Sequence, residues 1–197
     1  MLFNLNLLKK QNKMNNLFEI RYSPRALSDK EIDNSIIEDI FAIAGSSPSS
    51  FNSQPWRFLI LDKSNVLYNK VLSTMSNFNQ GWAKNASKLI VTLARNKYEH
   101  NGKNYKHSFY DLGQSVAYMT LRALEHGIYI RQMGGFDSEK LTELLNVDSN
   151  FDVLTLIAMG YLGNANDLKD EYLKIEKLPR TRKPLNEILI KDLNNLK

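Results

Sequence analysis

The sequence predicts an α+β fold in which helices cover a sheet, as in a three-layer sandwich. Helical and strand patterns alternate along the 197 residues, and two helical patterns are much longer than any strand pattern. In addition, no glycine-rich turn of the G-x-G-x-x-G or G-x-x-x-x-G-K-S/T kind follows a predicted strand. The absence of both motifs argues against a dinucleotide-binding Rossmann fold and against a P-loop.

The first predicted helix covers residues 28–45 and leads, through a polar loop, into the first predicted strand. Ser28 and Glu31 have the spacing of a capping box at the helix start, and Gly45 is a favourable helix end. An apolar face recurs every fourth residue, at Ile32, Ile36, Ile40 and Ala44. The strand covers residues 56–61. Its alternation places three apolar side chains on one side, namely Trp56, Phe58 and Ile60.

The remaining elements continue this alternation. Helices are predicted at 64–76, 108–126 and 138–146, and strands at 88–94, 128–130 and 153–162. The long helix has an apolar face formed by Leu112, Val116, Met119 and Ala123. Gly127 ends this helix. Gly113 lies inside it and costs about 1 kcal/mol relative to alanine. A glycine in such a position often marks close approach to the backbone.

The chain is predicted to form one domain. Residues 1–14 are interpreted as an N-terminal extension and residues 15–197 as the domain itself. Within the domain, residues 163–197 are polar apart from one apolar fragment, LNEILI. Such a segment has too little apolar content to form its own core, so we expect it to lie over a surface, such as that of another subunit.

The composition excludes several classes of function. The chain contains no cysteine, which excludes disulfides, thiol nucleophiles and cysteine-based metal sites and fits a reducing cytoplasm. Its three histidines have no metal-ligand spacing, so no metal site is predicted. No apolar run is long enough to span a membrane, and no membrane partner is predicted. The net charge of +5 is spread along the chain, which makes nucleic acid an improbable partner.

Two basic segments are candidates for binding an anion. Arg21, Ser23 and Arg25 lie within five residues around a proline, and the arginine fork suits a phosphate group. Arg180 and Arg182 alternate in an extended segment, so both side chains can face one anion. The alternative for each segment is an ordinary solvated basic stretch. Nothing in the local sequence says whether the two segments meet.

Two uncharged segments complete the candidates. Gly134 and Gly135 allow the backbone to approach a flat ligand, although a glycine pair also marks a plain turn. The segment SPSSFNSQPWRF, residues 47–58, offers donors and acceptors without charge. The residues concerned are Pro48, Ser49, Ser50, Asn52 and Gln54. The alternative for this segment is a turn that leads into a core strand.

Together these segments resemble the nitroreductase family of FMN-dependent oxidoreductases. The resemblance runs from about Arg21 to about Ile190 and rests on five motifs in order: RYSPR, PSSFNSQPWRF, DLGQSVAYMTLRALEHGI, MGGFD and RTRKPLNEI. It implies a central, mostly antiparallel sheet flanked by helices. It also implies an intertwined homodimer with FMN sites at the interface, in which residues 163–197 wrap the partner.

The resemblance also implies which residues contact FMN. They are Arg21, Tyr22, Ser23, Arg25, Pro48, Ser49, Ser50, Asn52, Gln54, Asn79, Met133, Gly134, Gly135, Arg180 and Arg182. The arginines would hold the phosphate, and residues 48–52 would reach the flavin from the opposite subunit. A backbone N–H at Gly134 or Gly135 would face the flavin N5. Gln54 and Asn79 would contact the ring or the ribityl chain. No side chain is assigned as an acid or base.

Three departures from the family pattern limit this transfer. Tyr22 replaces the second arginine of the usual Arg-Arg-Ser start, so one phosphate contact is altered. Gly134 stands where many relatives carry a larger residue such as glutamate. The segment between residues 90 and 111 is short, whereas larger relatives carry extra helices there that shape the substrate channel. Substrate specificity therefore does not transfer from the family to this chain.

The implied activity is transfer of reducing equivalents from NADH or NADPH, through FMN, to a nitroaromatic, a quinone or a similar acceptor, in a ping-pong order. One alternative is a flavoprotein of the same fold with a specialised reaction, such as pteridine reduction or flavin fragmentation. Another is a non-catalytic module that binds polyanions, which rests only on the basic pI and the PRTRK segment.

Overall fold

The computed structural model describes residues 17–192 and, within them, shows one sheet of four antiparallel strands. The strands are β1 (Trp56–Asp62), β2 (Lys88–Arg95), β3 (Ile128–Met133) and β4 (Phe151–Tyr161). Their order across the sheet is β1-β2-β4-β3, so β1 and β3 are the edges. The antiparallel sheet implied by the family resemblance is confirmed.

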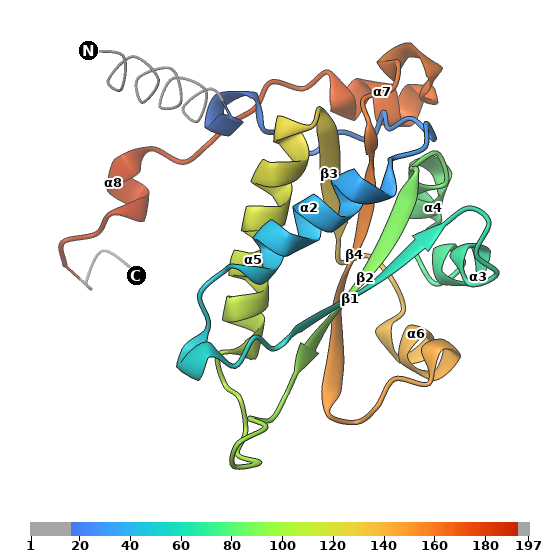
Figure 1. Ribbon diagram of the computed structural model, residues 1–197. Coiled ribbons are helices and arrows are strands. Elements are labelled where there is room, and N and C mark those ends of the chain that lie inside the picture. The colour runs from blue at the N-terminus through green and yellow to red at the C-terminus, as the bar shows by residue number, and fades with distance from the viewer. Residues whose placement is uncertain (1–16, 193–197) are drawn as a thin grey trace, which may run out of the picture.

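Helices lie on both faces of this sheet (Figure 1). They are α2 (Asn34–Gly45), α3 (Tyr68–Leu72), α4 (Asn77–Ala83), α5 (Ser108–Glu125), α6 (Ser138–Leu145), α7 (Asp170–Glu176) and α8 (Leu185–Ile188). Short 3-10 helices occur at η1 (Ser50–Asn52) and η2 (Ala165–Asp167). Because α2 and α5 pack on one face and α3, α4 and α6 on the other, the predicted three-layer α+β sandwich is confirmed.

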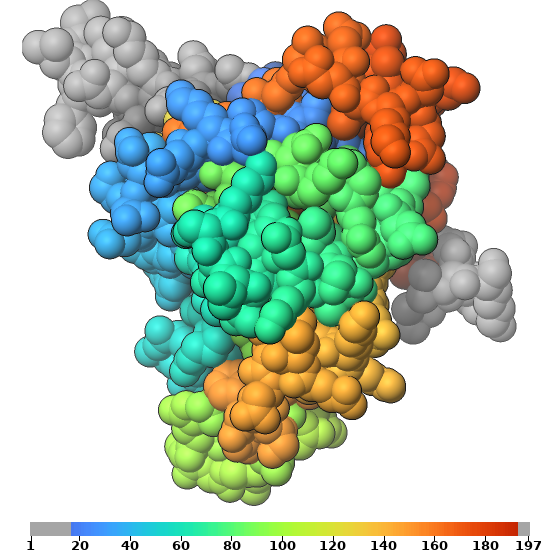
Figure 2. Space-filling view, turned by 90° about the vertical axis from the view of Figure 1, so that its right-hand side faces the viewer, coloured from blue at the N-terminus to red at the C-terminus, as the bar shows by residue number. Residues whose placement is uncertain are grey.

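Each face of the sheet has its own hydrophobic core, since successive side chains of a strand point to opposite faces. In β2, Leu89 and Val91 pack against α3, α4 and α6. Ile90 and Ala94 of the same strand pack against α2 and α5. Figure 2 shows the outside of the first of these layers, with α3 and α4 in the middle, α6 below them and α7 above. The side predicted for three residues of β1 is also confirmed: Trp56, Phe58 and Ile60 share one core.

Helix α5 is fixed by its apolar face and by one buried polar contact. The four residues of the predicted face are all buried: Leu112, Val116, Met119 and Ala123. In addition, the Ser115 hydroxyl donates a hydrogen bond of 2.8 Å to the carbonyl oxygen of Ala44, the last buried residue of α2. Gly127 follows α5 with a φ of +70°, a left-handed conformation that favours glycine. The predicted helix end is thus confirmed.

The start of the first helix differs from the prediction. Helix α2 begins at Asn34 rather than at residue 28, and Asp33 takes the N-cap position without a side-chain capping bond. The predicted capping box is wrong because the Ser28 N–H donates instead to the carbonyl oxygen of Tyr161, at the end of β4, over 2.8 Å. Pairing with the sheet therefore holds Ser28 in an extended segment and leaves Glu31 outside the helix.

The segment after β1 also differs. The predicted helix 64–76 is shortened to α3, because the Asp62 carboxylate accepts hydrogen bonds from the N–H groups of Ser64 and Asn65 and forms a turn. The sequence analysis does not predict α4 or α7. Helix α4 has the sequence NFNQGWA, whose asparagines and glycine have low helix propensity. Burial of Trp82 stabilises it instead.

An ionic network joins α2 to α5. Asp39 of α2 accepts hydrogen bonds from Nε and Nη2 of Arg122, over 2.6 and 2.8 Å. His126, just after α5, lies with Nε2 2.6 Å from Asp39 Oδ2, and Arg122 also pairs with Glu125 at 2.6 Å. The bond from Arg122, followed by that from His126, lowers the pKa of Asp39 to about 2. The ionised carboxylate is therefore the form that fits the folded protein.

We expect Asp39→Asn to lower the melting temperature at neutral pH. The folded pKa of Asp39, about 2, lies below its unfolded value near 3.8. Its stabilising effect is therefore complete above the unfolded value and is lost as the pH falls through the folded value. Thermal unfolding of both proteins between pH 7 and pH 2 should show a deficit that shrinks below about pH 4. Glu38→Gln, an exposed neighbour on α2, serves as the control; a deficit of constant size down to pH 2 would contradict the assignment.

Candidate functional site

Two basic segments that are far apart in sequence meet in one pocket of about 310 Å³. It is lined by Arg21, Tyr22, Ser23, Arg25, Arg131, Ile175, Glu176, Leu178, Arg180 and Arg182. The sequence alone leaves open whether residues 21–25 and 180–182 are close together, and the structure brings them together. We call five of these residues the arginine cluster: Arg21, Arg25, Arg131, Arg180 and Arg182.

Arg180 joins the C-terminal segment to the N-terminal one. Its Nη1 donates to the carbonyl oxygens of Glu19 and Arg21, over 3.1 and 2.8 Å. Glu19 lies in a helical turn at residues 17–20 and Arg21 directly follows it, at a helix end where backbone acceptors lack intrahelical partners. Burial, and then the charges of Arg180 and Arg182, lower the pKa of Arg21. The cluster therefore concentrates positive charge that a bound anion would stabilise.

Glu176 of α7 holds the arginine-bearing turn in place. Its two carboxylate oxygens accept the backbone N–H of Arg25 at 2.9 and 3.0 Å, and Oε1 lies 3.5 Å from the N–H of Ala26. The Glu176 side chain is only 9% exposed, and its Oε2 is 3.8 Å from Nη1 of Arg25. Glu176 is the one acidic residue among those that line the pocket, so positive charge remains in excess there. No sequence motif marks this glutamate.

Arg131 of β3 is a cluster member that the sequence analysis does not single out. Its guanidinium lies 5.3 Å from the centroid of the Trp82 ring and donates to the carbonyl oxygen of Ser23. Burial, followed by the charge of Arg25, lowers the pKa of Arg131 to about 10. The available signal is its position in RQMGGFD, three residues before the glycine pair. Its burial beside another arginine becomes visible only in the fold.

Tyr22 and Ser23 also line the pocket, as expected. The Tyr22 ring packs edge-to-face on Tyr129 of β3, with centroids 5.3 Å apart. Burial, and then the charge of Glu176, raises the pKa of Tyr22, so its hydroxyl stays protonated and can donate a hydrogen bond. Ser23 Oγ lies 3.5 Å from Nη1 of Arg21.

A second pocket, of about 540 Å³, lies beyond the end of β3. It is lined by Ser73, Thr74, Met75, Ser76, Asn77, Gln80, Gly134, Gly135, Phe136, Asp137 and Lys140. The carbonyl oxygen of Gly135 accepts hydrogen bonds from Nδ2 of Asn79, over 3.1 Å, and from the N–H of Ser76, over 2.9 Å. A Cβ on Gly135 would lie 2.8 Å from Nδ2 of Asn79, whereas no described atom lies within 4 Å of a Cβ on Gly134.

Met133 and Asn79 both contribute to the shape of the backbone at the second pocket. The Met133 side chain is 4% exposed and packs in the core under α3, α4 and α6, so only its backbone can face a ligand. Asn79 uses its side-chain amide to hold Gly135. Both residues thus position the backbone around the second pocket.

The polar loop at residues 47–54 is held by a buried carboxylate at the start of α5. Asp111 is 3% exposed and accepts the N–H of Ser50 over 2.9 Å and the hydroxyl of Tyr105 over 2.6 Å. Tyr105 also lies within 3.2 Å of the Ser50 carbonyl oxygen. Burial, followed by the bond to Asp111, raises the pKa of Tyr105. The sequence analysis does not identify Asp111 or Tyr105, whose positions depend on the fold.

The backbone of this loop is unusual. Phe51, Asn52 and Gln54 have φ values of 53°, 51° and 43°, in the left-handed region that side chains rarely adopt. The Gln54 N–H donates to Ser49 Oγ over 3.0 Å, and its Nε2 donates to the Asn52 carbonyl oxygen over 3.2 Å. Pro48 is exposed at the start of the loop. The bonds to Asp111 and within the loop keep its polar groups in this shape.

The loop and the arginine cluster lie at opposite ends of α5 (Figure 1). The loop binds Asp111 in the first turn of that helix. The N-terminal turn that Arg180 holds lies beside Arg122 and Glu125 in the last turn. Because α5 has 18 residues, it is about 27 Å long. One chain therefore does not bring together all the residues that the sequence analysis assigns to one site.

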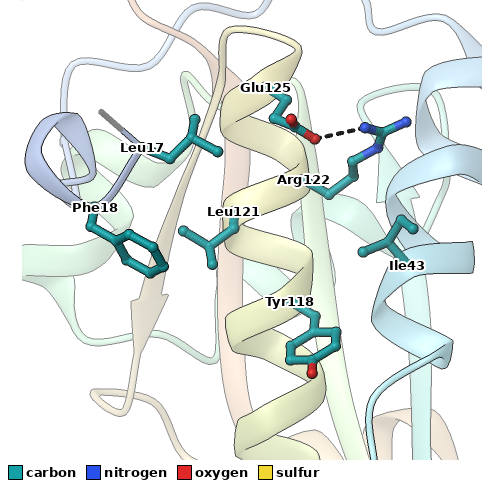
Figure 3. Close-up of a pocket in the computed structure, with 7 residues that line it drawn as sticks. All are labelled: Leu17, Phe18, Ile43, Tyr118, Leu121, Arg122 and Glu125. Atoms are coloured by element: carbon teal, nitrogen blue, oxygen red, sulfur yellow. Dashed lines mark hydrogen bonds and ion pairs between the residues drawn. The ribbon is translucent and has the colours of Figure 1, made fainter. Parts of the chain in front are cut away.

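An apolar pocket of about 240 Å³ lies between these two regions. Figure 3 shows Tyr118, Leu121, Arg122 and Glu125 on α5, Ile43 on α2, and Leu17 and Phe18 on the N-terminal turn. Phe18 is 56% exposed and Tyr118 is 41% exposed. The adjoining surface of α5 carries Tyr110, which is 71% exposed, and Gly113, beside which no described atom would contact a Cβ.

No helix within residues 17–192 is long and apolar enough to cross a membrane. Over the same residues, no group of three or more histidine, aspartate or glutamate side chains is arranged to hold a metal ion.

Comparison with known proteins finds one family. A sequence model of the Nitroreductase family matches residues 19–77 and 65–161. An NADH dehydrogenase/NAD(P)H nitroreductase of Archaeoglobus fulgidus is 31% identical over 158 residues, covering 77% of this chain and 85% of that protein. An iodotyrosine deiodinase of Hydra vulgaris is 22% identical over 213 residues, covering 94% of this chain and 75% of that protein.

Solved structures are similar as well. The crystal structure of an oxidoreductase containing FMN superimposes with a TM-score of 0.83 and 28% sequence identity. It covers 89% of this chain, and this chain covers 89% of it. The likeness therefore extends well beyond the four strands of the sheet.

We expect Gly135→Ala to destabilise the protein, because the added Cβ would displace the Asn79 amide and break its bond to the Gly135 carbonyl oxygen. A lost hydrogen bond of this kind costs about 0.5–1.5 kcal/mol. Urea unfolding measures the effect, and Gly134→Ala, beside open space, is the matched control. The Gly135→Ala penalty should shrink in an Asn79→Ala background. An equal penalty in both backgrounds would refute the proposed contact.

Proposed function

Because this chain belongs to the nitroreductase family, we propose that it is an FMN-dependent oxidoreductase. The proposed donor is NADH or NADPH, and the proposed acceptor is a nitroaromatic, a quinone or a similar electron-poor compound. One observation carries the proposal. Arg21 and Arg180 are 159 positions apart in the chain and still meet in one pocket with three further arginines.

The arginine cluster fits the phosphate of FMN. Its members offer planar forks of N–H donors, which suit phosphate oxygens in a bidentate arrangement. The pocket holds one carboxylate, and that carboxylate is engaged by the backbone N–H groups of Arg25 and Ala26. In addition, the buried Nε of Arg25 has no hydrogen-bond partner within residues 17–192. Buried donors of this kind are normally satisfied, and a bound anion would satisfy or screen this charge.

The second pocket fits the flat end of the same molecule. Arg131 lies in β3 and Gly134 directly follows that strand, so the two residues are three positions apart, a span of about 10 Å in an extended chain. A ribityl chain can bridge such a span, with the phosphate at the arginines and the ring beside the glycine pair. Gly134 has open space beside its Cα, and the Gly135 carbonyl is held by Asn79 and Ser76. The backbone there can therefore approach a planar ring without side-chain obstruction.

We propose that the site is completed by a second copy of the chain. Residues 48–52 lie at the far end of α5 from their own arginine cluster, so in a dimer they would serve the partner's FMN. The exposed apolar surface formed by α5 and the N-terminal turn supports this arrangement, since Tyr110 and Tyr118 of α5 and Phe18 of the turn are unusually exposed for a monomer. Helix α8 projects from the domain (Figure 1) with Leu185 and Ile188 exposed, as expected of a segment that wraps a partner.

The protein side chains orient and stabilise rather than react. When bound, FMN would supply the redox chemistry between NAD(P)H and the acceptor, in the proposed ping-pong order, while the arginine cluster would hold its phosphate. The positive cluster and the backbone donors near Gly134 would favour a negatively charged ligand state. No side chain is needed as an acid or base. A specialised reaction of the same cofactor is the second candidate, favoured by the similarity to the iodotyrosine deiodinase.

We expect the purified protein to be yellow and to lose its flavin absorbance on anaerobic addition of NADH or NADPH.

Arg21→Ala and Arg182→Ala should each weaken FMN binding by roughly 10- to 150-fold, the effect of losing one charge-assisted bond of about 1.5–3 kcal/mol. Titration of apo-protein with FMN, followed by fluorescence, measures the affinity. Lys70→Ala removes an exposed charge on α3 and should not change it. A wild-type protein that stays colourless after FMN addition would refute the function.

We expect the protein to sediment as a dimer. Because residues 48–52 would complete the partner's site, a mixture of two defective variants should form some intact sites. Arg21→Ala and Ser50→Pro proteins, mixed, unfolded together and refolded, should regain up to one intact site per mixed dimer. FMN titration counts tight sites in the mixture and in each parent. A monomer with full FMN occupancy would contradict the shared site.

A further inference from the structure

Three aromatic rings gather beside the polar loop, on the surface of the molecule. Phe51 of η1 meets Tyr98 edge-to-face, with centroids 5.8 Å apart, and meets His100 at 5.7 Å. Tyr98 and His100 are themselves 5.3 Å apart. We call Phe51, Tyr98 and His100 the aromatic wall. Two separate segments build it, namely the loop at 47–54 and the hairpin at 96–106.

Contacts with Tyr105 and Ser50, on its buried side, hold the aromatic wall in place. The Tyr98 ring stacks on Tyr105 with centroids 4.0 Å apart, and Tyr105 is 2% exposed. The Tyr98 hydroxyl also lies 3.0 Å from Ser50 Oγ. Tyr105 in turn donates to Asp111, which holds the N–H of Ser50. The hairpin and the loop are therefore joined through buried polar groups, and the wall has a fixed shape.

The backbone of Phe51 is strained, although the Phe51 side chain belongs to neither hydrophobic core. Its φ of 53° and ψ of 26° are left-handed, a conformation that phenylalanine rarely adopts. Its side chain is nevertheless 81% exposed, more than any other phenylalanine, tyrosine or tryptophan within residues 17–192. Strained backbone that supports no core contact often marks a functional site. The strained backbone of Phe51 presents an aromatic ring to the outside.

We propose that the aromatic wall selects planar, electron-poor aromatic acceptors by stacking on their rings. The inference rests on the proposed function, in which residues 48–52 reach the FMN of the partner. Phe51 lies within that segment, so its ring would border the place where the acceptor binds. A phenyl or phenol ring attracts the ring of a quinone or nitroaromatic, through offset or edge contacts, more strongly than an acceptor without a ring.

The test compares a ring acceptor with one that has no ring. In FMN-loaded dimer, kcat/KM is measured for 1,4-benzoquinone and for ferricyanide, in wild type and in Phe51→Leu, which keeps apolar bulk and removes the ring. The quinone-to-ferricyanide ratio should fall roughly 2- to 12-fold, the effect of one aromatic contact. Calorimetric titration with benzoate, a ring that is not reduced, should show a dissociation constant raised by a similar factor.

Two further variants make the outcome decisive. His100→Leu changes an exposed wall residue and should lower the same ratio even if Phe51→Leu disturbs the loop. Val66→Ala, also 81% exposed but outside the wall, should leave the ratio unchanged. An unchanged ratio in both wall variants would overturn the inference while the proposed function stands. A wild-type protein that binds no FMN, or that reduces neither acceptor, would overturn both.

Discussion

The whole structure depends on a sheet that is buried on both faces. Because β2 and β4 lie in the middle and are covered on either side, their buried side chains are mostly apolar and are unavailable for ligand chemistry. The polar groups that can bind a ligand are therefore displaced to the β3 edge and to the segments around it. This is where Arg131, the glycine pair and the two chain-terminal basic segments are found.

The charges of the arginine cluster and of Glu176 then determine how the β3 edge of the sheet is built. Gathering five arginines costs free energy unless their charge is balanced, and only Glu176 among the residues lining the pocket is acidic. Its carboxylate is used chiefly to hold backbone N–H groups, which fixes the position of Arg25 without neutralising the cluster. The protein thus combines a rigid frame with an excess of positive charge. At the other end of α5, the Asp111 carboxylate likewise accepts a backbone N–H, that of Ser50, and so holds an uncharged loop in place.

Elements whose pattern agreed with their packing could be predicted from the sequence. The face of α5, the side of β1 and the antiparallel sheet implied by the family motifs are of this kind. The capping box at Ser28 failed because pairing with Tyr161 is a long-range contact that local spacing does not contain. Helix α4 was missed since the burial of Trp82, rather than propensity, stabilises it. In the site, arginines within motifs could be found, whereas Arg131, Glu176 and Asp111 gain their roles only from neighbours distant in sequence.

The long sequence separation within the arginine cluster also sets an order of events. Arg21 is made 159 positions before Arg180, and a hydrogen bond joins the two residues in the folded chain. Closing so large a loop is entropically costly and requires the intervening sheet to be in place. An emerging chain therefore has no complete anion pocket until residues 180–182 have been made and can reach residues 21–25. In the proposed enzyme, FMN would therefore bind only after the sheet has folded and the two basic segments have met.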